Sequence, residues 1–247
     1  MDSQEKKVLQ KNRMLSYFAK STIEILDTEG LEAVTIRKVA DRAGYNSATL
    51  YHYFANLDHL IFFASIHYLK DYALDLSVHL PEIKDSIQAY LKVWECFCRR
   101  SYEQPAIYEM IFFQDFAGID LNETIKTYYK VFPNEITKDI QEYSPMLTES
   151  NIYRREFIAL SKALKAKSIR LPEKDLHRIT EMNVLIYRGM LSESKSQVRL
   201  KISVDDAVDH TVEFMKRSLA AYGIPCGDTI IAPTNGAQCS TRRKAAV

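Results

Sequence analysis

The sequence predicts an all-α protein, and three features of the chain support that class. Apolar residues recur at spacings of three and four along most of the 247 residues, which is the pattern of helices with one buried face. Seven glycines and seven prolines are few for this length, so long helices can run uninterrupted. The sequence also lacks the sustained alternation of polar and apolar residues that would predict a β-strand.

The first helix is predicted from one apolar face, which consists of Leu15, Phe18, Ala19, Ile23 and Leu26. Gly30 is expected to end this helix in the left-handed αL conformation. Thr35 is a suitable N-cap for a second, short helix that runs to Ala43, and Gly44 permits a left-handed turn after it.

Asn46 can cap a third helix over residues 47–54. Asn56 can cap a fourth helix, which continues to Leu80 and ends at Pro81. Further helices are expected over residues 82–102, 105–117, 121–143 (interrupted near Pro133), 148–169, 173–193 and 203–222.

We divide the chain into an N-terminal three-helix domain (residues 1–57), a larger helical domain (58–222) and a C-terminal tail (223–247). The tail is rich in glycine and proline and ends in basic residues, which predicts a flexible segment.

The composition limits the classes of partner and compartment. The formal net charge is +1, and the first 60 residues carry eight Lys or Arg and eight Asp or Glu, so any nucleic-acid contact must be local. The N-terminus lacks the apolar stretch of a signal peptide, and no run approaches the ~20 apolar residues of a membrane span. The four cysteines lack the pattern of a zinc or disulfide site. We expect a cytoplasmic protein with no metal or membrane contact.

Two short helices joined by a glycine-containing turn form a helix-turn-helix, whose second helix enters the DNA major groove. Here the outer face of the second helix offers Ser47, Thr49, His52 and Tyr53 to base edges and phosphates. Arg37, Lys38 and Arg42 on the preceding helix supply cations. On spacing alone, a plain helical hairpin with a solvated polar face fits equally well.

The stretch T-I-R-K-V-A-D-R-A-G-Y-N-S-A-T-L-Y-H-Y-F-A-N-L-D-H-L is more specific than this spacing. It resembles the DNA-binding segment of the TetR family of bacterial transcriptional regulators, and the resemblance covers about the first 60 residues. The matching positions are Thr35, Arg37, Ala40, Ala43, Gly44, Leu50, Tyr51, Phe54 and Leu60.

The resemblance implies a role for each residue that matches the family pattern. Thr35 and Arg37 would contact the DNA backbone, and Asn46 would cap the recognition helix. Three residues would face base edges, namely Ser47, Ala48 and Thr49. Three would hold phosphates, namely Tyr51, His52 and Tyr53.

Three departures from the family pattern bear on affinity. Leu57 stands where the family usually has a phosphate-binding Lys, Tyr53 replaces a His, and Tyr45 replaces a Val. A lost phosphate contact weakens DNA binding. It also reduces the steepness of the plot of log binding constant against log salt concentration by about 0.9 per contact. Leu57 therefore also favours an alternative, in which a TetR-like helical dimer has lost specific DNA binding and acts through protein partners.

The larger domain is expected to bind a small-molecule effector. Residues 61–135 hold 15 of the 27 aromatic residues, and apolar walls with a few polar tips are typical of small-molecule sites. Most of these rings are expected to be core residues; our candidates for the pocket lining are Tyr90, Trp94, Tyr108 and Phe112. Two basic pairs, Arg99-Arg100 and Arg154-Arg155, suit either an anionic ligand or an ordinary charged surface.

His67, Asp71, Asp75 and His79 recur every four residues along the fourth predicted helix. A metal or sensor site is one interpretation of this series. We favour a solvated stripe with local ion pairs, because the series spans three turns and a helix cannot wrap four ligands around one ion.

The last two predicted helices carry broad apolar faces, which suit a dimer interface built as a four-helix bundle. The candidate residues are Met182, Ile186, Gly189, Met190, Val208, Val212, Met215 and Leu219. The alternative is that these faces pack inside one subunit.

Together, these features predict a homodimeric transcriptional regulator on a pseudo-palindromic double-stranded operator. The resemblance implies a repressor that a small molecule releases from DNA. Activation of transcription is the alternative. The sequence holds no Gly-rich phosphate motif, no H-E-x-x-H and no G-x-S-x-G, so we expect neither an enzyme nor a cofactor.

Overall fold

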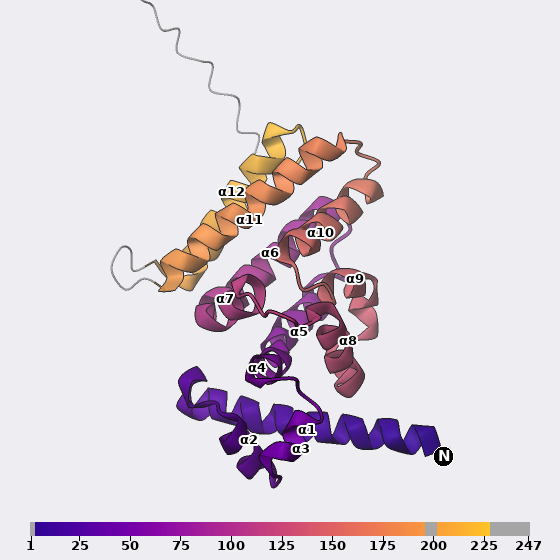
Figure 1. Cartoon of the computed structure of the whole chain (residues 1–247). Helices are drawn as coiled ribbons and strands as arrows, with labels where there is room; N and C mark the ends of the chain where they lie inside the picture. The colour runs from indigo at the N-terminus through magenta and orange to yellow at the C-terminus, as the bar shows by residue number, and fades with distance from the viewer. Residues whose placement is uncertain (1–2, 196–201, 228–247) are drawn as a thin grey trace, which may run out of the picture.

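The computed structural model describes residues 3–195 and 202–227, and all regular structure within those ranges is helical. The helices form an elongated molecule with α1, α2 and α3 at one end and α11 and α12 at the other (Figure 1). None of the helices in these ranges has the length and apolar character that a membrane span requires.

The N-terminal end contains α1 (Ser3–Glu29), α2 (Ile36–Ala43) and α3 (Ser47–Tyr51). Its core forms where α1 inserts Phe18 against α2 and α3, which contribute Val39 and Leu50. All three side chains are fully buried, so the short helices are held in place by packing rather than by their own helix propensity. A short 3-10 turn, η1 (Leu31–Ala33), joins α1 to α2.

The predicted caps and turns in this part of the sequence are confirmed with one exception, Gly30, and the helix expected over residues 47–54 ends at Tyr51. Thr35 caps α2, Gly44 adopts the αL conformation with φ 79° and ψ 26°, and Asn46 caps α3. Gly30 differs from the αL prediction: its φ is 84° but its ψ is 173°. This combination of a positive φ and an extended ψ is open mainly to glycine, and η1 begins at the next residue, Leu31.

The predicted fourth helix is divided. α4 (Leu57–Ser65) passes into a 3-10 segment, η2 (Ile66–Leu69), and then into α5 (Lys70–His79). Asn56 accepts a hydrogen bond from the His59 N–H at the start of α4, as predicted. The result is a rod that leads from the N-terminal end into the middle of the molecule (Figure 1).

The centre of the molecule is α6 (Ser86–Glu103), which packs against α5, α10 and α12. Around it lie α7 (Pro105–Phe113), α8 (Leu121–Val131), η3 (Pro133–Glu135), η4 (Lys138–Tyr143), α9 (Ser144–Leu147) and α10 (Ile152–Ala166). The helix expected over 121–143 is interrupted at Pro133, as predicted, because η3 begins there and η4 follows it. The helix expected over 148–169 is the single helix α10, which begins at Ile152 and ends at Ala166.

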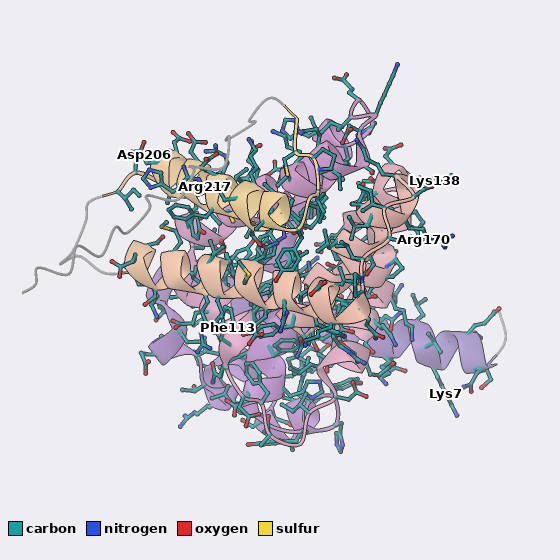
Figure 2. The ribbon with its side chains drawn as sticks, turned by 90° about the horizontal axis from the view of Figure 1, so that it is seen from above. Lys7, Phe113, Lys138, Arg170, Asp206 and Arg217 are labelled. Atoms are coloured by element: carbon teal, nitrogen blue, oxygen red, sulfur yellow. The ribbon has the colours of Figure 1, made fainter. Side chains whose placement is uncertain are left out.

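The far end consists of α11 (Glu173–Lys195) and α12 (Val204–Ala221), which lie side by side (Figure 2). The first residues of the predicted tail pack against the larger domain: Ile224 is buried, and Gln88 Nε2 on α6 donates to the Cys226 carbonyl oxygen over 2.5 Å. The remainder of that predicted tail lies outside the described residues.

Candidate nucleic-acid interface

The α2–turn–α3 unit presents a polar outer face. Ala48, Tyr51 and His52 are exposed, whereas Ser47 and Thr49 are partly buried. The Asn46 side-chain oxygen accepts from the Thr49 N–H over 2.8 Å and from the Thr49 hydroxyl over 3.0 Å. Because α3 has only five residues, any contact of this unit with DNA would depend on its side chains more than on a helix dipole.

The residues that we expect to contact the DNA backbone differ in their exposure and in the protein groups that they already contact. Tyr51 is 56% exposed, and the Arg37 side chain is 89% exposed with only a long ion pair to Asp41 at 3.8 Å. Thr35 is also exposed, but its hydroxyl accepts from the Lys38 N–H as the cap of α2. Tyr53 is half-buried and its ring lies 5.9 Å from that of Phe18, so it supports the core as well as the surface.

An acidic residue that sequence reasoning missed lies among the cations of α2. Glu29, the last residue of α1, forms ion pairs with Lys38 and, over 3.2 Å, with Arg42. The hydrogen bond from Lys38 is the main reason that the pKa of Glu29 lies below its ordinary value. The two cations are therefore partly neutralised inside the protein before any phosphate approaches them.

The departures at positions 57 and 45 have structural explanations. Leu57 is half-buried and packs on the apolar core, so it serves the start of α4 rather than a phosphate. Tyr45 stacks on Tyr17 of α1, with ring centroids 6.5 Å apart, and leans on Phe18 at 5.6 Å. Both tyrosines are exposed, so the face next to α3 carries an aromatic pair that the motif alone does not reveal.

The four candidate pocket residues all lie in the core of the larger domain. Tyr90, Trp94, Tyr108 and Phe112 are each at most 9% exposed. Only Trp94 among them lines the small cavity between α5, α6, α9 and α10, whose volume is about 20 Å³. Tyr108 donates instead to the Tyr68 carbonyl oxygen over 3.2 Å, and Phe112 packs against Phe97.

Beside this cavity lies a buried carboxyl group that was not predicted. Glu156 of α10 accepts from the Tyr90 hydroxyl over 2.5 Å, from Trp94 Nε1 over 2.7 Å and from Asn183 Nδ2 over 3.0 Å. Burial raises the pKa of Glu156 to about 7, although these hydrogen bonds oppose the shift.

The polar series on the fourth helix is distributed among separate partners. Asp75 holds Arg100 of α6 through two hydrogen bonds of 2.7 and 2.9 Å, and His67 lies 3.7 Å from Glu135. Within the part of the chain that the structure describes, no three His, Cys, Asp or Glu side chains converge on a metal position. The cysteines there form no disulfide, and burial raises the pKa of Cys96 and Cys98 to about 12.

The candidate dimer residues fall into two groups. Met182 and Gly189 are exposed on α11, and three others are half-buried: Ile186, Met190 and Val212. By contrast, three residues of α12 that we expected at the interface are at most 1% exposed within one subunit: Val208, Met215 and Leu219. These three side chains face α6 and α11, so the outward surface of α12 is made by Phe214 and its neighbours.

Comparison with known proteins places the N-terminal end in a family. Residues 20–62 match the family described as bacterial regulatory proteins, tetR family. This segment contains the end of α1, all of α2 and α3 and the start of α4, and thus the whole helix-turn-helix. None of the curated proteins compared with the sequence matches it.

One solved structure resembles the chain in fold over most of its length. A structure assigned to the TetR family of transcriptional regulators, from Mesorhizobium loti MAFF303099, superposes with a TM-score of 0.50 at 11% identity. The match covers 87% of this chain and 97% of that one, and it shows a shared fold. The TetR-family regulator PfmR of Thermus thermophilus aligns with a TM-score of 0.39 at 15% identity, over 82% of this chain and 97% of that one.

Proposed function

We propose, from the premise that this chain is a TetR-family transcriptional regulator, that it acts in the cytoplasm as a homodimeric repressor. In this proposal it binds a pseudo-palindromic operator in double-stranded DNA and leaves it when a small molecule binds. The observation that carries the proposal is the capped α2–turn–α3 unit, which leaves Tyr51, His52 and Arg37 free on one outer face.

The dimer in this proposal uses the outward surface of α11 and α12. Met182, Leu185, Ile186 and Gly189 share one face of α11, since they are spaced by three, one and three residues. Leu185 is 52% exposed, and Phe214 of α12 is 43% exposed. A Cβ on Gly189 would meet no atom within 4 Å of its own subunit, which leaves room for the close approach of a second copy.

The path for release runs through the rod formed by α4, η2 and α5. An effector bound near α5 and α6 favours one packing of this rod, and the rod carries the change to the α2–α3 unit. Operator affinity then falls by the coupling free energy between the two sites, which typically corresponds to about 5- to 150-fold.

The test is a fluorescence-anisotropy titration of the full chain against DNA that flanks its own gene, at two salt concentrations. We expect specific binding that weakens with salt and is strongly reduced by Arg37→Ala or Tyr51→Ala. Arg170→Ala is the matched control, because it removes one exposed charge from the loop after α10 (Figure 2). An equal loss of DNA affinity in the control would contradict the proposed interface. So would an affinity that neither Arg37→Ala nor Tyr51→Ala reduces.

A second candidate function is favoured by Leu57 and Glu29. Leu57 stands in place of a side chain that would bind a phosphate, and Glu29 forms ion pairs with Lys38 and Arg42. Both features favour a dimer that acts through protein partners. Selection from a genomic DNA library distinguishes the two functions: enrichment of a site supports the repressor, and no enrichment by a folded dimer supports the alternative.

A further inference from the structure

The cavity between α5, α6, α9 and α10 contains a buried cation that lacks a charged partner. Arg155 of α10 lines this cavity and is only 3% exposed. Its Nη1 donates to the carbonyl oxygens of Leu147 and Glu149, over 3.0 and 3.1 Å. Its Nη2 is buried and has no hydrogen-bond acceptor among the described residues.

The surroundings of Arg155 do not neutralise it. Its guanidinium lies against the rings of Phe112 and Phe97, at 5.2 and 5.9 Å from their centroids. Across residues 3–195 and 202–227 no carboxylate forms an ion pair with it. Burial of an uncompensated charge is costly, so an unpaired arginine in a core calls for a partner that binds there.

The carboxyl group that lines the same cavity, that of Glu156, already has hydrogen-bond donors. Glu156 receives hydrogen bonds from Tyr90, Trp94 and Asn183, so its oxygens have little capacity left for a cationic or donor-bearing ligand. Asn183 has an unpaired side-chain oxygen, but Asn183 does not line this cavity. What the cavity lacks, among the described residues, is therefore an anionic partner for Arg155.

The remaining walls are apolar. They include Phe97 from α6 and Met146 from α9, and the Tyr72 hydroxyl of α5 lies within hydrogen-bonding reach of the guanidinium. The volume of about 20 Å³ holds roughly one water molecule, so a larger ligand must displace part of the wall. The four-residue helix α9 is the smallest element there, and Arg155 itself binds the carbonyl oxygen of its last residue, Leu147.

We propose that this cavity is the effector site and that the effector is an organic acid, whose carboxylate accepts from Arg155 Nη2 while its apolar body displaces Met146. This inference rests on the proposed function, since it names the chemistry of the ligand that releases the DNA. Because Arg155 also holds α9, and α9 packs against η4 beside α5, a ligand at this guanidinium acts next to the rod that leads to the α2–α3 unit.

The chain carries a reporter for the test. Trp94 is the only tryptophan, it lines the cavity, and its indole N–H donates to Glu156. Its fluorescence can be followed without DNA while the full chain is titrated with octanoate or benzoate. Octanamide, benzamide and octylamine are the matched probes, because they keep the apolar body and replace the carboxylate.

We expect a saturable change of Trp94 fluorescence with at least one acid, and binding about 10- to 100-fold tighter than that of its amide, as for a hydrogen bond to a charged group. Arg155→Gln should remove this preference, whereas Arg154→Gln, at the exposed neighbouring position, should keep it. A thermal melt checks that Arg155→Gln is folded, and the preference of the wild type for acid over amide does not depend on any variant.

Three outcomes overturn the inference: no saturable response to either acid, an amide or amine that binds as tightly as its acid, or unchanged octanoate binding by folded Arg155→Gln. Anisotropy with operator DNA separates this result from the proposed function. If an acid binds at Trp94 but leaves operator affinity unchanged, the acid-binding site is supported and the proposal that a ligand releases the DNA is contradicted. If an uncharged compound or an amine releases the DNA and no acid binds, release stands and the acid site fails.

Discussion

The Tyr68 hydroxyl donates a hydrogen bond to Asp27 Oδ1 over 2.6 Å, and this bond joins the last turns of α1 to η2, the 3-10 break between α4 and α5. The backbone of the same tyrosine accepts from the Tyr108 hydroxyl of α7. Burial and the neighbouring Asp27 carboxylate raise the pKa of Tyr68, so its hydroxyl stays a donor at physiological pH. Tyr68 thus connects the end that carries the helix-turn-helix with the aromatic core of the larger domain.

We expect Tyr68→Phe and Asp27→Ala each to lower the free energy of unfolding by about 1 kcal/mol, because each removes one hydrogen bond between the hydroxyl and a charged acceptor. The two effects should not add, since either change breaks the same bond. Urea denaturation of the two single variants and the double variant measures the coupling. Fully additive losses would show that the bond contributes nothing of its own.

Glu29 is expected to restrain DNA binding, because it occupies Lys38 and Arg42. Glu29→Gln should tighten operator binding about threefold to tenfold and steepen the salt dependence by about 0.9 for each cation that reaches a phosphate. Anisotropy titrations at several salt concentrations give both quantities. Glu24→Gln removes the same charge from an exposed position on α1, and an equal gain there would mean that net charge alone is responsible.

The local signals of the helix-turn-helix could be predicted from the sequence because their causes lie within a few residues. Thr35 and Asn46 accept hydrogen bonds from the N–H groups three residues later in the chain. Gly44 adopts the αL conformation, which glycine reaches without strain. The outward surface of α12 could not be predicted in the same way. An apolar face shows that something covers it but not what, and α6 of the same subunit covers Val208, Met215 and Leu219.

The burial of Arg155 and Glu156 on α10 was not predicted, although the sequence contains a signal for it; Arg155 was considered only as part of a basic pair that suits an anionic ligand or a charged surface. Ile152, Ala159, Leu160 and Ala163 form one helical stripe, and positions 155 and 156 fall on that stripe. Charged residues within an apolar stripe indicate buried polar groups, and the structure places Arg155 and Glu156 there. Their partners could not be predicted, because Tyr90 and Asn183 are distant in sequence from Glu156.

The proposed dimer predicts that a charge on α11 separates the subunits. Leu185→Asp should shift the protein from dimer to monomer at micromolar concentration, because an unpaired carboxylate would be buried between two copies. Sedimentation velocity measures the shift, and circular dichroism checks that the helices persist. Leu74→Asp on α5 is the matched control, since Leu74 and Leu185 are both 52% exposed. Dissociation by the control, with Leu185→Asp still dimeric, would move the interface to α5.

Glu156 makes the stability of the protein depend on pH in an unusual direction for a carboxyl group. Its pKa is raised by burial from an ordinary 4.5 to about 7 in the folded chain, so the folded state binds this proton more tightly than the unfolded state. The stabilisation is fully present below pH 4.5 and is lost as the pH rises to about 7, and the loss is on the order of 3 kcal/mol.

Urea denaturation of wild type and Glu156→Gln across this range isolates the contribution, because other carboxyl groups titrate equally in both. We expect the free-energy difference between wild type and variant to shift steadily against the wild type between about pH 4.5 and pH 7. The amide keeps the size of the side chain but pairs less well with the Trp94 N–H, so the variant starts from a lower stability at acid pH. A difference that does not change with pH would show that Glu156 stays ionised throughout, held by its three donors.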